Sequence, residues 1–445
     1  MVENRARNLC DNEGHLVSYF SWATKVSALA IAGQAVAYLL AIVLARHSGM
    51  EGFESYVVAS AAFILMVTLV SQGLEKYALN LIPPLLDRAE WRPLRGYLQF
   101  GVRRTLWACG IVGAAVGIWA CHARDFTAQT RLAIVVSCVS LPAGALAHFA
   151  LEVLTALGGA VSATAIFRVA VPAMALTFVS LFVVVHQGIS GPMAVASWGL
   201  AWAVALGLMA WRIWHAAPQG IYRAKAVEDP RRWAAEARPF WVYRVSLAVL
   251  AQAGVVTLEW MRPTSSAVGA FAVAASTAGL VQVLATATNR GYASRLSVLL
   301  EQRDFEGILH LRLQRLRWLA GPLLVYLAVT FGFTRQLLAF FRPEFIDEGV
   351  VPLRVLASVT SLSTVLAMAP TYLKFRRKNR TLYRNVAIAA AVQVVLLMSL
   401  VPSLGATGAA TAYAVAMCLL YGNLARLAHR ELEGLRTSSA NRAQR

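Results

Sequence analysis

The chain carries little charge for its length. Only 14% of its 445 residues are Asp, Glu, Lys or Arg, whereas 58% are hydrophobic, and a soluble domain usually has about 25% charged residues. Apolar runs of about twenty residues recur along the whole length, a pattern typical of helices that cross a membrane. The composition therefore excludes an ordinary soluble protein and indicates an integral membrane protein with many spans.

The chain also lacks the residue patterns of familiar catalytic and metal sites. Its five cysteines show no CxxC spacing and fit small buried side chains better than metal ligands. No HExxH, GxSxG or P-loop motif is present, and His148 stands alone in an apolar run. We therefore expect no bound metal, no catalytic residues and no enzymatic activity.

The excess of positive charge follows the polar gaps between the apolar runs. The formal net charge is +19, and no aromatic-basic recognition module accompanies it. Alternate gaps divide the Lys and Arg residues into a set of thirty and a set of six. Loops that stay in the cytoplasm carry such an excess, so we expect both termini in the cytoplasm and no nucleic-acid partner.

The predicted fold is an all-α integral membrane fold with about twelve transmembrane helices. The predicted spans are 22–45, 56–80, 98–120, 131–151, 163–185, 193–214, 239–260, 268–289, 315–333, 349–373, 382–401 and 405–426.

The two halves of the chain share a sequence pattern. FSWATKVSAL at 20–29 and FWVYRVSLA at 240–248 place Trp, a cation, Val and Ser at matching positions, and YVVA at 56–59 matches FAVA at 271–274. Six spans return the chain to its starting side, so both halves have the same orientation. Such parallel repeats form two six-helix lobes around a central cleft, which favours transport over catalysis.

The polar, basic stretch between the halves marks the boundary of the lobes. The predicted organisation is a cytoplasmic segment 1–21, a first lobe 22–214, a basic linker 215–238, a second lobe 239–426 and a cytoplasmic tail 427–445.

Three stretches resemble a known family. Its first outer loop and second helix are matched by LARHSGMEGFESYVVASAAFILMVTLVSQGLEKYALNLIP (44–83), the approach to its tenth helix by FFRPEFIDEGVVPLRVLA (340–357), and the start of its last helix by VPSLGATGAATAYAVA (401–416). By these stretches the chain resembles the Wzx-type polysaccharide flippases of the multidrug/oligosaccharidyl-lipid/polysaccharide (MOP) exporter superfamily.

The resemblance implies a function. It implies that the chain moves a polyprenyl-pyrophosphate-linked oligosaccharide, made for O-antigen, exopolysaccharide or capsule, from the inner to the outer leaflet of a bacterial plasma (inner) membrane. The partners implied are this lipid-linked oligosaccharide, the lipid bilayer, and the polymerase and glycosyltransferases of the same pathway. No cofactor is implied, and a coupling ion, H⁺ or Na⁺, is left open.

Lys25 and Arg244 are the candidate ligands of the pyrophosphate. They occupy equivalent positions of the repeat, about one turn inside the cytoplasmic ends of the first and seventh spans, which line the cleft in the family resembled. A pyrophosphate that leaves water needs cations as partners. The alternative is that both are interfacial anchors, whose long side chains reach the headgroups at low cost.

Other polar residues of the first, second, seventh and eighth spans are candidates for the rim of the cleft or for contacts with the glycan. They are Lys76, Arg290, Gln34, Gln252, Gln72, Gln282 and Asn289. The amides fit hydrogen bonds to sugar hydroxyls and equally fit bonds between helices. Arg168 and Arg354 are expected to be interfacial.

Two further function classes remain as alternatives. A MATE-like, cation-coupled drug antiporter of the same superfamily needs a buried carboxylate, but Glu75, Glu152 and Glu259 all lie near the ends of spans. A membrane enzyme of glycan assembly needs acidic residues in a large outer loop, and the outer loops here are short.

Overall fold

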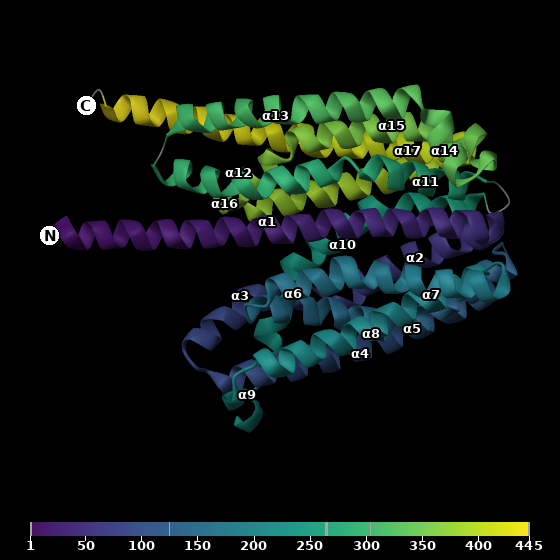
Figure 1. The fold of residues 1–445 in the computed structure, drawn as a ribbon, viewed down its shortest axis with the longest axis horizontal. Coiled ribbons are helices and arrows are strands. Elements are labelled where there is room, and N and C mark those ends of the chain that lie inside the picture. The colour runs from purple at the N-terminus through teal and green to yellow at the C-terminus, as the bar shows by residue number, and fades with distance from the viewer. Residues whose placement is uncertain (1, 124, 263–265, 303, 444–445) are drawn as a thin grey trace.

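The computed structural model describes the backbone of residues 2–123, 125–262, 266–302 and 304–443, and the side chains of these ranges except 2–24, 287, 290–291, 294 and 434–443. In the described ranges every regular element is a helix (Figure 1). The first half contains α1 (Val2–His47), α2 (Gly49–Ser71), α3 (Leu74–Asp87), α4 (Trp91–His122), α5 (Ala128–Ala156), α6 (Ala160–Thr164), the π-helix η1 (Ala165–Ala170), α7 (Val171–His186), α8 (Gly191–Ala216) and α9 (Gln219–Arg223). The second half contains α10 (Pro230–Met261), α11 (Ala267–Gly279), α12 (Gln282–Gln302), α13 (Phe305–Gly332), α14 (Thr334–Phe341), the 3₁₀-helix η2 (Pro343–Phe345), α15 (Ile346–Leu366), α16 (Met368–Phe375) and α17 (Asn379–Ala443).

The helices confirm the predicted membrane fold. Within the described residues ten helices are long and apolar enough to cross a membrane, or eleven if the bent pair α13 and α14 forms one span. Gly405 lies inside α17 with φ 55° and ψ −130°, so α17 folds back on itself there, as Figure 1 shows. Counting the two arms of α17 separately brings the eleven spans to twelve.

The turns between helices alternate between two ends of the molecule. Both termini lie at one end, which we call the terminal end, and the turns α3–α4, α8–α10, α12–α13 and α16–α17 lie there too (Figure 1). These are the gaps that hold most of the Lys and Arg residues. The opposite end, which we call the far end, carries the shorter and less basic turns.

The hydrophobic core is joined at the far end and divided at the terminal end. One cluster at the far end combines both halves, for example Phe63 and Val273. At the terminal end, one cluster holds residues of the first half and the start of α10, such as Tyr97 and Trp233. A separate cluster there holds only residues of the second half, such as Leu311. The two lobes are thus packed together at one end and apart at the other.

The predicted linker is partly helical. α10 begins at Pro230, and the side chain of Asp229 accepts a hydrogen bond from the backbone N–H of Arg232, the usual arrangement of a helix N-cap. Trp233 and Ala237 then pack into the cluster of the first half. The start of α10 therefore lies against the first lobe, although the rest of α10 leads into the second lobe.

The second span is broken between α2 and α3. Gln72 and Gly73 both have positive φ, at 51° and 76°. A Cβ on Gly73 would lie 2.5 Å from the backbone oxygen of Ala237, so glycine permits α10 to approach the break closely. The indole Nε1 of Trp241 donates a 3.1 Å hydrogen bond to the carbonyl of Leu69, an acceptor in the last turn of α2. Trp241 of the repeated motif therefore stabilises the break.

Gly73→Ala is expected to destabilise the chain. The positive φ alone costs about 1–3 kcal/mol in a non-glycine residue, and the new methyl group would collide with the backbone of α10. The measurement is the melting temperature of the purified protein, together with its abundance in membranes. Gly110→Ala is the matched control, because no atom lies within 4 Å of its added Cβ. Equal stability of the two variants would contradict the role assigned to Gly73.

Candidate functional site

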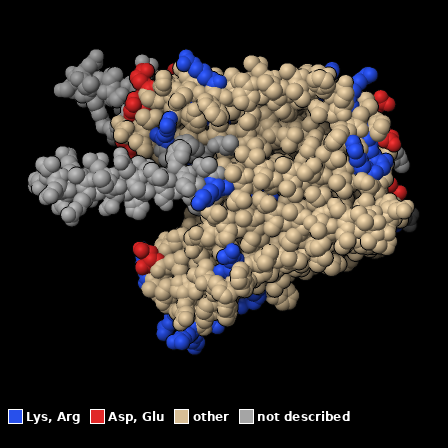
Figure 2. Space-filling view, in the orientation of Figure 1, with Lys and Arg blue, Asp and Glu red and all other residues tan. Residues whose placement is uncertain are grey.

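A cavity of about 530 Å³ lies between the two lobes. Its walls come from α1, α5, α6 and η1 of the first half and from α11 and α12 of the second half. On the face drawn in Figure 2 the two lobes separate towards the terminal end. This between-lobe cleft is the central cleft that the repeat predicts, and its volume is in the range of small-molecule sites.

The cleft has a largely polar lining. The predicted residues Gln34 and Gln282 both line it, one from each lobe. The other polar side chains that line the cleft are Glu152, Thr155, Thr164, Arg168, Ser276 and Thr286. Amides, hydroxyls and a guanidinium can donate hydrogen bonds to the oxygen atoms of a glycan or a phosphate.

Arg168 reaches the cleft because the fifth span contains a π-helix. The six residues of η1, from Ala165 to Ala170, interrupt the α-helical spacing, and such turns are frequent at functional sites. Here η1 crosses α1 at Gly33, where an added Cβ would lie 1.9 Å from the backbone oxygen of Arg168. This close crossing places Arg168 and Phe167 in the cleft wall, whereas the sequence suggests an interfacial role for Arg168.

The carboxylate in the cleft is paired with a cation. Glu152 lies in the wall and forms an ion pair with Lys76 of α3. The Glu152 side chain is 9% exposed and that of Lys76 is 32% exposed. The pair holds Lys76 next to a residue of the cleft wall and offsets the negative charge that Glu152 would otherwise present. The rim role of Lys76 stays a prediction.

Arg244 is likewise held by a carboxylate. Its Nε lies 3.6 Å from Oε1 of Glu75, whose side chain is 2% exposed. The pair joins the first turn of α3, directly after the break, to α10. Arg244 therefore has a structural partner, and its role as a ligand stays a prediction.

Lys25 differs from its repeat equivalent. Its residue is exposed and directly precedes Val26, which lines the cleft. Among the described side chains, Lys25 has no ion pair or hydrogen bond. Lys25 is thus a cation available near the cleft, while the side chain of Arg290 lies outside the described residues.

Three of the predicted amides serve other contacts or lie outside the cleft lining. The side-chain oxygen of Gln72 accepts a hydrogen bond from Arg104, and that of Asn289 accepts one from Arg315. Gln252 lies half-buried on α10. Hydrogen bonds between helices are a common use of amides in membranes, and they account for Gln72 and Asn289.

His148 packs against aromatic rings near three of the cations. Its ring stacks on Trp202 with centroids 5.4 Å apart and meets Phe167 edge-on at 4.7 Å, so it is a packed residue beneath η1. Arg244, Lys76 and Arg168 all lie within Coulombic range of it. Lys76 and Arg244 are each paired with a carboxylate, and Arg168 is the one of the three that lines the cleft.

The far end of the cleft is closed by contacts between the lobes. Nε of Arg46 donates a 2.9 Å hydrogen bond to the carbonyl of Phe340, and Nε of Arg342 donates in return to the carbonyl of Ala45. The backbone N–H of Gly269 donates a 3.2 Å hydrogen bond to Oε1 of Glu54. Glu54 and Gly269 are 215 positions apart, the same separation as between the matching stretches 56–59 and 271–274 of the two halves. The two lobes therefore meet here through equivalent positions of the repeat.

The fold is that of MOP superfamily transporters. An inward-facing multidrug resistance MATE family transporter of the MOP superfamily superimposes with a TM-score of 0.71 at 14% identity, over 91% of this chain and 96% of that chain. The lipid II flippase MurJ, in an inward closed conformation, gives 0.71 at 9% identity, over 90% and 86%. An outward-facing MATE transporter of the superfamily gives only 0.59 at 14% identity, over 93% and 96%. No protein-family model and no curated protein sequence matches the chain.

The TM-scores agree with the way the two lobes are packed in this structure. The higher score with the inward-facing transporter fits lobes that are joined at the far end and separated at the terminal end. These likenesses show the fold.

Arg244→Ala is expected to reduce stability by about 3–5 kcal/mol, because it leaves the buried carboxylate of Glu75 without its partner. Adding Glu75→Gln removes that charge and should restore most of the loss. Thermal melting and membrane abundance of the single and double variants measure the effect, with Arg231→Ala on the same helix as the control. Equal losses in the single and double variants would show that the pair contributes nothing to stability.

Arg46→Ala combined with Arg342→Ala is expected to open the far end. The probe is Ser276→Cys, a cleft residue, in a chain whose five cysteines are replaced by serine. Labelling by a membrane-impermeant maleimide added on the far-end side should rise several-fold, because both donors to the opposite lobe are lost. Arg335→Ala, an exposed cation at the same end, should leave labelling unchanged. No rise in the double variant would mean that the two arginines do not hold the lobes closed.

Proposed function

We propose that the chain is a flippase that moves a polyprenyl-pyrophosphate-linked oligosaccharide from the cytoplasmic to the outer leaflet of a bacterial plasma membrane by alternating access. The oligosaccharide would serve surface polysaccharide synthesis, as O-antigen, exopolysaccharide or capsule. The polymerase and glycosyltransferases of that pathway would be its partners.

The observation that carries the proposal is the chemistry of the between-lobe cleft. Gln34, Gln282 and the hydroxyl side chains offer hydrogen bonds suited to sugars, and Arg168 offers a charge suited to phosphate. Lys76 offsets the carboxylate of Glu152. A neutral glycan with an anionic headgroup matches such a lining better than a cationic drug does.

The cations would act at successive positions. Lys25, exposed beside the cleft, would meet the pyrophosphate first, and Arg168 would hold it in the wall. Arg244 and Lys76, each paired with a carboxylate, would donate hydrogen bonds to the pyrophosphate without adding net charge, and Arg290 would stand at the rim. Gln34 and Gln282 would bind the sugars while the lipid tail stays in the bilayer between the lobes.

The charge of the turns supports the direction of entry. The terminal end carries the basic turns, so it would face the cytoplasm under the positive-inside rule. The cleft would then accept cargo from the cytoplasmic leaflet, where the lobes are apart. Opening of the far-end contacts would release the cargo on the other side.

A MATE-like antiporter for cationic drugs is the second candidate. The likeness to the inward-facing MATE transporter favours it as much as the likeness to MurJ favours a lipid substrate. The cleft carboxylate weighs against it, because Glu152 already has Lys76 as its partner. The coupling ion, H⁺ or Na⁺, stays open under both candidates.

A deletion strain tests the proposal. Loss of the gene, in a strain without a redundant flippase, should deplete surface polysaccharide and accumulate its lipid-linked precursor. The combination of Lys25→Ala and Arg168→Ala should restore the polysaccharide at least about tenfold less well than the intact chain, because two charge-assisted contacts are lost. Arg335→Ala at matched membrane abundance is the control.

The alternative outcomes are distinct. Unchanged glycan levels on deletion, with a raised sensitivity to cationic drugs, would replace the flippase by the antiporter. Depletion on deletion with full rescue by the double variant would keep the flippase and remove Lys25 and Arg168 from the anion site.

A further inference from the structure

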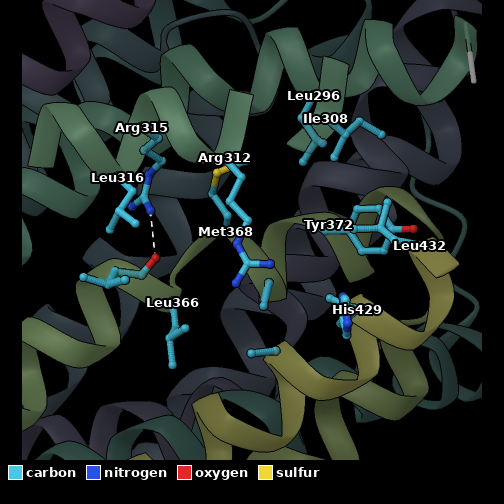
Figure 3. Close-up of a pocket in the computed structure, with 14 residues that line it drawn as sticks. Leu296, Ile308, Arg312, Arg315, Leu316, Leu366, Met368, Tyr372, His429 and Leu432 are labelled. Carbon is cyan, nitrogen blue, oxygen red and sulfur yellow. Dashed lines mark hydrogen bonds between the residues drawn. The ribbon is translucent and has the colours of Figure 1, made fainter. Parts of the chain in front are cut away.

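A second pocket lies within the second lobe, away from the between-lobe cleft. It is lined by α12, α13, α15, α16 and α17 near the terminal end (Figure 3). Its volume is about 100 Å³, and it shares no lining residue with the cleft. At roughly 30 Å³ for each molecule, this volume holds about three water molecules. It is therefore large enough for a phosphate group with the first carbon atoms attached to it.

Arg315 forms one wall of this pocket and brings a buried charge. The residue is 2% exposed, and its guanidinium donates 2.9 Å hydrogen bonds to the carbonyls of Val365 and Thr364 and to the side chain of Asn289. All three acceptors are neutral, and no carboxylate pairs with Arg315 among the described side chains. Neutral acceptors fix the guanidinium in place but leave its charge without a counter-ion, which is costly inside a protein.

The other polar groups of the pocket are also donors. Tyr372 is 3% exposed, and its hydroxyl has no hydrogen-bond partner in the described part of the chain. In Figure 3 Arg312 points towards the middle of the pocket, between Arg315 on one side and Tyr372 on the other. His429 completes the set from α17 and also lies 3.1 Å from Glu433. Two guanidinium groups and an unused hydroxyl suit an anion with several oxygen atoms.

The surroundings of the pocket point to a lipid as the source of that anion. Most of the lining is apolar, including Leu296, Ile308 and Leu316. Leu316 is 43% exposed and the neighbouring Trp318 is 68% exposed, so α13 presents an apolar surface beside the pocket. Arg312 and Arg315 stand where the predicted ninth span begins. That place in the sequence corresponds to the depth of the headgroups, which exposed tryptophans also favour.

We infer that this pocket binds the phosphate of an anionic phospholipid, whose acyl chains lie along the exposed face of α13. Basic pockets between membrane helices recognise anionic headgroups in this way. The cavity admits only the phosphate and the adjoining carbons, so the chains must stay outside, on Leu316 and Trp318. The site is independent of the cargo in the cleft.

Lipid binding to the purified full chain tests the inference. Phosphatidylglycerol added to the detergent-solubilised protein should raise its melting temperature, whereas zwitterionic phosphatidylcholine and inorganic phosphate should not. Arg312→Gln should weaken phosphatidylglycerol binding about tenfold, which corresponds to the loss of one charge-assisted hydrogen bond. Arg317→Gln is the matched control, an exposed arginine of α13 outside the pocket lining.

Tyr372→Phe is a second variant that tests the inference even if Arg312→Gln does not fold. It removes a hydroxyl that has no partner in the described structure, so the melting temperature without lipid should not fall, while phosphatidylglycerol binding should weaken about threefold. Equal binding by the intact chain, Arg312→Gln and Tyr372→Phe would overturn the inference. Stabilisation by inorganic phosphate as strong as that by phosphatidylglycerol would overturn the assignment to a lipid.

Discussion

The packing of the two lobes against each other at the far end is the constraint on which the rest of the structure depends. Lipid tails are as apolar as leucine, so hydrophobicity alone does not hold membrane helices together, and close packing and polar contacts must do so. At the far end both are present, in the joined core and in the hydrogen bonds of Arg46, Arg342 and Gly269. Because the core divides towards the terminal end, the lobes separate there and leave the cleft.

The spans and the repeat could be predicted because each is a property of a continuous stretch of sequence. Partners that depend on a break in a helix could not be predicted. Glu75 and Glu152 stand near the ends of their spans in the sequence, with no sign of what they face. The turn at Gln72–Gly73 redirects α3, so that Glu75 meets Arg244 and Lys76 meets Glu152. The apolar pattern carries no information on such pairs.

The position of Arg168 in the cleft could not be predicted from the sequence either. In the sequence it is a cation at the start of an apolar run, which fits an interfacial anchor. Its place in the cleft depends on the π-helix η1 and on the lack of a side chain at Gly33. The glycine and the π-helix lie on different helices, and their contact depends on how these helices cross, which the sequence does not show. Gln34 and Gln282 are among five candidate amides, because an amide within an apolar run is visible in the sequence by itself. The sequence does not distinguish these two, which line the cleft, from the other three.

The three stretches that resemble the flippase family contribute residues to the packing of the helices and of the two lobes. They contribute Glu54 and Arg342 to the contacts between the lobes and Gly405 to the turn within α17. No residue that lines the cleft lies in any of the three. A resemblance carried by these stretches therefore concerns how the helices and lobes pack. It does not identify the cargo, and an inward-facing multidrug transporter and a lipid flippase match the fold with the same TM-score of 0.71. The nature of the cargo has to be argued from the polar side chains of the cleft itself, and there Arg168 and the neutralised Glu152 favour an anionic headgroup over a cationic drug.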